Sequence, residues 1–180
     1  MKNLLIPTFA LLLLVFASCQ KEGLETASGH GQTLSVVPDR NISARSAEVP
    51  FKANFNTTLA SSGGENGIFT VDIIGVGNAT HLGKSTQQSN SMLNATVIPW
   101  VQSGTQNAWT AANGDELFWS FSGTVNPPNE QGIITYSGSW DITGGSGRFK
   151  GVTGSGTYVG SASLVTNQGE ITYDGSLKGL

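Results

Sequence analysis

The sequence predicts an all-β fold of about eight strands closed into a barrel. From residue 49 onward, apolar and polar residues alternate with a period of two, as in strands with one buried face, and no segment carries a sustained helical stripe. Short stretches rich in Gly, Asn and Ser separate the alternating segments. Glycines inside the strands, where a chain bends sharply or packs closely, favour a barrel over a sandwich: Gly75, Gly77, Gly123, Gly138 and Gly160.

The composition supports a single strand-rich domain. Charged residues make up 12% of the chain, about half the usual share, while Gly, Ser, Thr and Asn supply most of the polarity. The formal net charge is −3, and the basic residues are scattered rather than clustered, which argues against a nucleic-acid partner. After removal of the N-terminal segment discussed next, about 160 residues remain, enough for one domain with a core.

The first 18 residues have the organisation of a secretory signal peptide. Lys2 precedes an apolar run over residues 4–16, which then meets the small residues Ala17 and Ser18. The run is about a dozen residues long, shorter than the roughly 20 that a membrane-spanning helix needs. The sequence therefore predicts export with removal of residues 1–18.

Cys19, the only cysteine of the chain, follows directly in "FASC", which resembles the lipobox of bacterial lipoproteins. The resemblance implies acylation of Cys19, anchoring to a membrane without a spanning helix, and a place in the bacterial cell envelope as an outer-membrane lipoprotein. The alternative is a plain signal peptide followed by a free thiol. Residues 19–23, "CQKEG", resemble tags of surface-exposed lipoproteins in some Gram-negative bacteria.

Residues 19–48 are polar, contain Gly and Ser, and lack aromatic side chains. Such a composition is typical of a flexible tether. A weak alternation at residues 33–37 leaves room for one short strand. The predicted organisation is therefore a signal peptide (1–18), a tether (19–48) and a β-barrel domain (49–180).

In the first half of the barrel domain, residues 50–58 and 67–77 each place apolar side chains on one face. Residues 89–100 form a predicted strand with less regular alternation, which ends at Pro99 because proline cannot donate a hydrogen bond to a strand ladder. Residues 107–125 form a hairpin about Asn113-Gly114, a favoured two-residue turn because both positions tolerate positive φ.

The second half contains three further strands, at residues 132–143, 156–165 and 169–179. Between the first two lies "TGGSGRFKGVTGSGT", residues 143–157, whose glycines and two cations resemble those of a phosphate-binding loop. The spacing around its lysine fits neither the P-loop nor the dinucleotide motif, and a strand rather than a helix follows. We expect instead a connection with positive φ at Gly144-Gly145 and one helical turn that lays two apolar side chains across a barrel end, with two cations in solvent: Phe149, Val152, Arg148 and Lys150.

Three stretches, "ITGGSGRFKGVTGSGTY", "ATHLGKS" and "TAANGDELF", resemble the allene oxide cyclase and dirigent-like barrel families, and within them the bacterial lipoprotein members. The resemblance covers residues 51–179 and implies an eight-stranded antiparallel closed barrel of the calycin-like type. Allene oxide cyclases act on a fatty-acid epoxide with a buried carboxylate, and dirigent proteins steer radical coupling. Neither set of acidic residues matches this chain, so the activities are not carried over.

The inward aromatic side chains are the candidate ligand-lining residues, together with a histidine where a strand turns: Trp119, Phe121, Tyr136, Trp140, Tyr158, Tyr173 and His81. An eight-stranded barrel is just wide enough for its own side chains to fill it, which favours a packed core. The alternative is a pocket for one small apolar ligand, with tyrosine hydroxyls as orienting groups.

The sequence offers no catalytic set. Asp72, Glu116 and Asp174 alternate outward, no G-x-S-x-G elbow has its strand-to-helix context, and His30 and His81 do not form a metal-ligand pattern. We therefore predict no metal and no cofactor, and a non-catalytic lipid-anchored protein that binds a small hydrophobic ligand or a surface partner. The alternatives are an isomerase or cyclase acting inside the barrel, and a structural or adhesive envelope protein.

Overall fold

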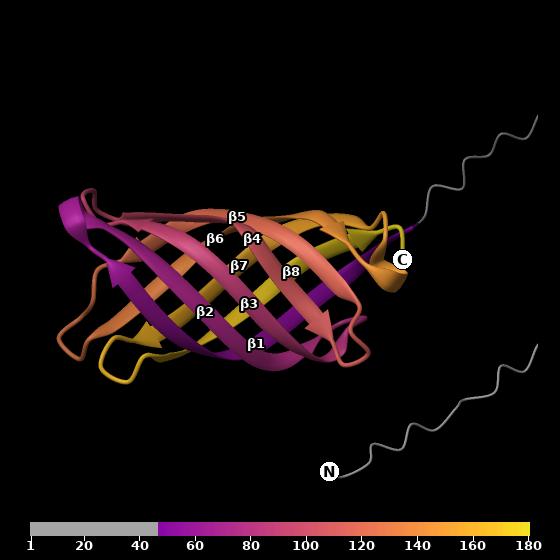
Figure 1. The fold of residues 1–180 in the computed structure, drawn as a ribbon, viewed down its shortest axis with the longest axis horizontal. Helices are drawn as coiled ribbons and strands as arrows, with labels where there is room; N and C mark the ends of the chain where they lie inside the picture. Colours follow the sequence, from indigo (N-terminus) through magenta and orange to yellow (C-terminus); the bar gives the residue numbers. More distant parts are fainter. Residues whose placement is uncertain (1–46) are drawn as a thin grey trace, which may run out of the picture. The chain divides into compact units, whose positions relative to one another are not determined.

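The structure, a computed structural model, describes residues 47–180. These residues form a closed antiparallel barrel in which eight strands pair in chain order (Figure 1). The prediction of an all-β, eight-stranded closed barrel is therefore confirmed. The predicted signal peptide, Cys19, His30, the optional strand at 33–37 and the tether up to residue 46 lie outside the described residues.

All eight strands are long, from 11 to 16 residues. The pairing of β1 with β8, from Glu48 opposite Lys178 to Thr58 opposite Gln168, closes the barrel. The two short 3-10 turns of the described residues are η1 (Glu65–Gly67) and η2 (Gly147–Phe149), and no helix in this part of the chain is long and apolar enough to cross a membrane. The strands are β1 (Glu48–Gly63), β2 (Ile68–Ala79), β3 (Gly83–Asn94), β4 (Trp100–Ala111), β5 (Glu116–Asn126), β6 (Ile133–Gly145), β7 (Thr153–Ser163) and β8 (Gln168–Lys178).

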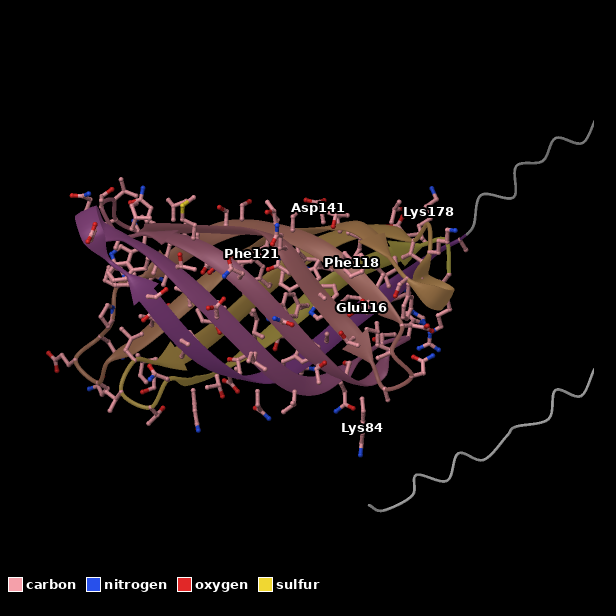
Figure 2. All side chains as sticks on the ribbon, in the orientation of Figure 1. Lys84, Glu116, Phe118, Phe121, Asp141 and Lys178 are labelled. Carbon is pink, nitrogen blue, oxygen red and sulfur yellow. The ribbon has the colours of Figure 1, made fainter. Side chains whose placement is uncertain are left out.

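The period-two alternation places side chains inside and outside the barrel. On β1, Phe51 and Phe55 are buried, whereas Lys52 between them is exposed and its Nζ lies 3.0 Å from an Asp174 carboxylate oxygen on β8. Figure 2 shows charged side chains such as Lys84 projecting from the outer surface. The interior is thus apolar and aromatic for most of its length, while the charges lie outside.

The predicted strand over residues 89–100 is wrong in its extent. β3 ends at Asn94, residues 95–99 form a connection, and β4 begins at Trp100. Two apolar residues of the connection, Val97 and Ile98, continue the apolar character of the strand, but both are exposed. Apolar content without regular alternation therefore marked a loop here.

The turn at Asn113-Gly114 also differs from the prediction. Within the connection 112–115, residues 112–114 form a three-residue turn, closed by a hydrogen bond of 2.9 Å from the Ala111 amide to the Asp115 carbonyl. Of the predicted pair, Gly114 alone takes positive φ, at 87°. This geometry is the type I turn with a glycine bulge that suits three-residue hairpins, rather than the two-residue turn.

The two ends of the barrel differ in their connections (Figure 1). At one end, which we call the plug end, lie the connections 80–82, 112–115 and 146–152, with the start of β1 and the end of β8. At the other, the mouth end, lie the connections 64–67, 95–99, 127–132 and 164–167. Each strand therefore runs the full distance between plug and mouth.

The glycine-rich segment closes the plug end. As expected, it contains a single helical turn, η2, and buries Phe149 and Val152, while Arg148 and Lys150 are exposed. Three residues separate this turn from the start of β7. Positive φ occurs at Gly147 (56°) and Gly151 (82°), not at the expected Gly144-Gly145. Those two glycines are the last residues of β6, where the strand conformation excludes positive φ.

Arg148 joins the three connections of the plug end. Its Nη2 donates to the His81 carbonyl at 2.7 Å, its Nε lies 3.6 Å from an Asp115 carboxylate oxygen, and its guanidinium stands 4.8 Å from the ring centre of Phe149. Arg148 thus has a structural role in this end of the barrel.

Glycines inside the strands make room for aromatic rings. Gly156 on β7 and Gly175 on β8 face each other, and a Cβ added to either would lie 2.6 Å from the Trp140 ring. Trp140 can therefore lie flat against the barrel wall only because both positions lack a side chain. Its indole Nε1 donates to the Thr157 carbonyl at 3.1 Å, which satisfies its polar atom.

Candidate functional site

Aromatic side chains fill the half of the barrel next to the plug end, and we call this half the plug half and its packed rings the aromatic plug. Trp109 lies at their centre, with ring centres 4.6 Å from Trp119, 5.1 Å from Phe51, 5.4 Å from Trp140 and 4.9 Å from Tyr173. The Trp109 and Trp119 planes differ by 16°, and the pair is stacked. These packed rings occupy the interior at this level of the barrel.

The mouth half encloses a cavity of about 180 Å³. For comparison, an apolar protein cavity of about 150 Å³ admits benzene. A filled interior and a pocket, which the sequence left as alternatives, therefore each describe one half of the barrel. Much of the wall is apolar, including Leu59, Phe69, Val71, Ile73, Leu93, Trp100, Val125, Ile134, Leu164 and Ile171.

Five of the seven sequence-predicted site residues line this cavity: Trp119, Phe121, Tyr136, Tyr158 and Tyr173. Trp140 packs in the plug half instead. His81 lies at the plug end with φ of 69°, is exposed, and has its Nε2 3.2 Å from the Pro50 carbonyl oxygen. The structure thus brings five of these residues together and leaves two apart.

The inner face of β3 is polar. Four polar side chains of this strand point into the barrel and are therefore buried: Ser85, Gln87, Ser89 and Ser91. Ser89 donates to Asn107 Oδ1 on β4 at 2.7 Å, and Asn107 Nδ2 donates to the Trp119 carbonyl at 2.8 Å. The small serine side chains leave space that larger residues would fill, which is one reason for a cavity at this level.

Across the cavity, polar atoms are also paired. Gln102 Nε2 on β4 donates to the Tyr158 hydroxyl at 3.0 Å, and the Tyr136 hydroxyl donates to the Glu170 carbonyl at 3.1 Å. These bonds fix two tyrosine rings in the cavity wall. The hydroxyls of Tyr136 and Tyr158 are therefore both hydrogen-bonded within the protein.

We call the inner end of the cavity, formed by Gln87, Trp119 and Tyr173, the floor. It differs from the rest of the wall because its side-chain polar atoms are unpaired. Gln87, Trp119 and Tyr173 are each 1% exposed and line the cavity. Within the described part of the chain, neither Gln87 side-chain atom, nor Trp119 Nε1, nor the Tyr173 hydroxyl has a hydrogen-bond partner. Buried polar groups are nearly always paired, so four such atoms at one level need an explanation.

The tyrosines of the cavity are held in their neutral form. Burial raises the pKa of Tyr136 to about 12 and that of Tyr158 to about 12, with smaller opposing effects from Thr57 and Gln102 respectively. Burial raises the pKa of Tyr173 well above its ordinary value as well; Gln87 opposes that rise, although the two groups do not meet in hydrogen-bond geometry. These hydroxyls therefore act as neutral hydrogen-bonding groups at ordinary pH.

The cavity lining carries no formal charge at neutral pH. Asp, Glu, His, Lys and Arg are all absent from the described residues that line it. The predicted outward positions of Asp72 and Asp174 are correct, and Glu116 lies near the plug end, half-buried, where it accepts from Thr110. Within residues 47–180 no three His, Cys, Asp or Glu side chains form a group able to hold a metal ion.

Sequence-based prediction missed the polar lining residues, chiefly Gln87, Ser89 and Gln102. The stretch "KSTQQSNS" gives no apolar alternation, so its first half was not recognised as strand. A signal was present nonetheless for the serines: inward Ser85, Ser89 and Ser91 alternate with larger outward residues, whereas Gln87 carries no such signal.

Comparison of the chain with protein-family models, with curated proteins and with solved structures gives no match. The resemblance to allene oxide cyclases and dirigent-like barrels therefore rests on the quoted residues alone and stays a prediction.

Proposed function

We propose that this protein is a lipid-anchored barrel of the bacterial cell envelope that binds a small hydrophobic ligand in its mouth half. The observation that carries the proposal is the cavity of about 180 Å³ with an apolar wall and a few polar groups at its floor. Such a combination is typical of small-molecule sites, in which apolar surface supplies affinity and a few polar atoms supply orientation.

Binding without catalysis is favoured over an isomerase or cyclase activity. An acid or base inside the barrel would need a titratable group whose pKa lies near the working pH. The tyrosines are the titratable groups among the lining residues, and burial moves their pKa values upward, away from neutrality. His81, the histidine among the predicted lining residues, lies at the plug end, away from the cavity.

The test uses two neighbouring residues of β2 that point in opposite directions. Ile73 lines the cavity, whereas Ile74 is 62% exposed on the outer surface. We expect toluene to bind the protein, and Ile73→Trp to weaken that binding at least tenfold because the larger ring occupies the cavity. The matched control, Ile74→Trp, adds the same ring outside and should bind toluene as the unchanged protein does.

Binding is measured by calorimetry or by ligand-detected nuclear magnetic resonance, with far-ultraviolet circular dichroism to show that each variant is folded. Absence of binding of both toluene and its polar counterpart acetophenone to the unchanged protein would refute the proposal. Equal binding by both variants would also contradict it, because the ligand would then lie elsewhere.

The membrane anchor is tested separately. Cys19→Ser removes the only thiol of the chain and with it the predicted acylation site. We expect the variant to lose its association with the membrane fraction, since no other lipid attachment site is predicted. Ser28→Ala, a change in the predicted tether, serves as the control and should leave the association intact. Continued membrane association of Cys19→Ser would disprove the lipoprotein assignment.

A further inference from the structure

The floor of the cavity is assembled from three strands that are distant in the sequence. Gln87 comes from β3, Trp119 from β5 and Tyr173 from β8. Trp119 and Tyr173 both rest on Trp109, with ring centres 4.6 Å and 4.9 Å away, and their own ring centres lie 5.4 Å apart. Trp109 therefore supports two of the three side chains, Trp119 and Tyr173, at the inner end of the cavity.

These three side chains hold four of the buried polar atoms that have no partner in the described chain. Thr57 Oγ1 and Trp109 Nε1 also lack partners, but neither residue lines the cavity. Farther along the wall, the polar side chains are paired: Ser89 donates to Asn107 behind the wall, and Gln102 donates to Tyr158. Unpaired capacity that faces the cavity is therefore concentrated at the floor.

The unpaired groups offer more donors than acceptors. Gln87 Nε2 and Trp119 Nε1 can only donate, the Tyr173 hydroxyl can donate or accept, and Gln87 Oε1 can only accept. A ligand atom that accepts hydrogen bonds is therefore the better match. An oxygen with two lone pairs, as in a carbonyl group, can accept from two of these donors at once.

The charge of the ligand follows from the charge of the lining. With no Lys, Arg or His among the lining residues, a carboxylate at the floor would be buried without a counter-charge. With no Asp or Glu among them, the same is true of an ammonium group. Burial of an unpaired charge is strongly unfavourable, whereas a neutral polar group needs hydrogen bonds alone.

We propose that the cavity selects neutral apolar molecules that carry one carbonyl-type acceptor oxygen, with this oxygen at the floor among Gln87, Trp119 and Tyr173 and the apolar body toward the mouth. The proposal rests on the proposed function, since it specifies the ligand class of the same cavity. Leu93, Trp100 and Leu164, which line the mouth side, would contact the apolar body.

The experiment compares four ring compounds of similar size on the full protein at pH 7: toluene, acetophenone, benzoate and benzylammonium. We expect acetophenone to bind at least tenfold more tightly than either charged compound. In Gln87→Leu, which has a similar side-chain volume but no polar atoms, acetophenone binding should weaken about tenfold, while toluene binding should stay within about twofold. Tyr173→Phe should likewise weaken acetophenone and spare toluene.

The same variants keep the result interpretable. Gln87→Leu removes two unpaired buried atoms, so its thermal midpoint should equal or exceed that of the unchanged protein. If toluene binds but neither variant alters the affinity for acetophenone relative to toluene, the inference is wrong while the proposed function stands. The same conclusion follows if benzoate binds as tightly as acetophenone. If neither toluene nor acetophenone binds, both are wrong.

Discussion

Trp109→Ala is expected to lower the free energy of unfolding of the barrel by about 3–5 kcal/mol. Trp109 is fully buried and contacts Phe51, Trp119, Trp140 and Tyr173, so alanine leaves a large void at the centre of the plug. Small domains are stable by only about 5–15 kcal/mol. A single substitution therefore removes a large part of the stability.

The measurement is urea unfolding followed by far-ultraviolet circular dichroism, in which the backbone signal of the strands reports unfolding of each variant against its own folded baseline. Trp100→Ala is the matched control, because Trp100 lies half-buried at the mouth and outside the plug. We expect the control to unfold near the midpoint of the unchanged protein. Similar midpoints for the two alanine variants would show that the plug is not the main packed core.

Alkaline pH is expected to unfold the protein between about pH 10 and pH 12. The three tyrosines of the chain, Tyr136, Tyr158 and Tyr173, all lie inside the barrel with raised pKa values. Below pH 10 they are neutral in both the folded and the unfolded chain, so their contribution to stability is fully present. Above pH 10 the unfolded chain loses these protons and the folded chain keeps them, so stability falls as pH rises.

The fall should be steep. Each tyrosine contributes about 1.4 kcal/mol per pH unit in this window, or about 4 kcal/mol per unit for all three. Tyrosinate absorbance and circular dichroism should therefore change together in one cooperative step. Tyr173→Phe, which removes a hydroxyl with no partner in the described chain, should move this step to higher pH. Tyrosines that titrate near pH 10 in a folded barrel would contradict the buried placement.

The strands that could be predicted from the sequence are those with apolar inner faces. On β8, Ile171, Tyr173 and Leu177 alternate with polar residues and are all buried, as the pattern indicates. The turn at η2 was also predictable, since Phe149 and Val152 are apolar residues in a glycine-rich connection that must close a barrel end. In these places the burial of apolar surface decides both the local pattern and the fold.

The candidate site could be predicted only in part. Periodicity assigns Trp119 and Tyr173 to the interior, but it does not say whether inward side chains meet across the barrel or leave space between them. That outcome depends on the small inward serines of β3 and on a bulge in β4. The bulge at residues 105–106 changes the inward parity from Gln102 and Gly104 to Asn107 and Trp109, which no period-two pattern anticipates.

The glutamine of the polar floor was missed for a related reason. Gln87 lies in a stretch without apolar alternation, and nothing in a single sequence indicates that a glutamine will be buried without a partner. Natural proteins retain such unfavourable groups chiefly where function requires them. Of the three floor residues, Gln87 is the one that the sequence did not predict, and it is also the one whose two side-chain polar atoms are both unpaired among the described residues.

The most direct test of a ligand-binding barrel is a crystal structure of the protein grown with acetophenone. We expect the ring in the mouth half, within the cavity of about 180 Å³, and the ketone oxygen within hydrogen-bond distance of Gln87, Trp119 or Tyr173. If side chains fill the mouth half of the barrel, and acetophenone is bound elsewhere or not at all, the ligand-binding account is contradicted.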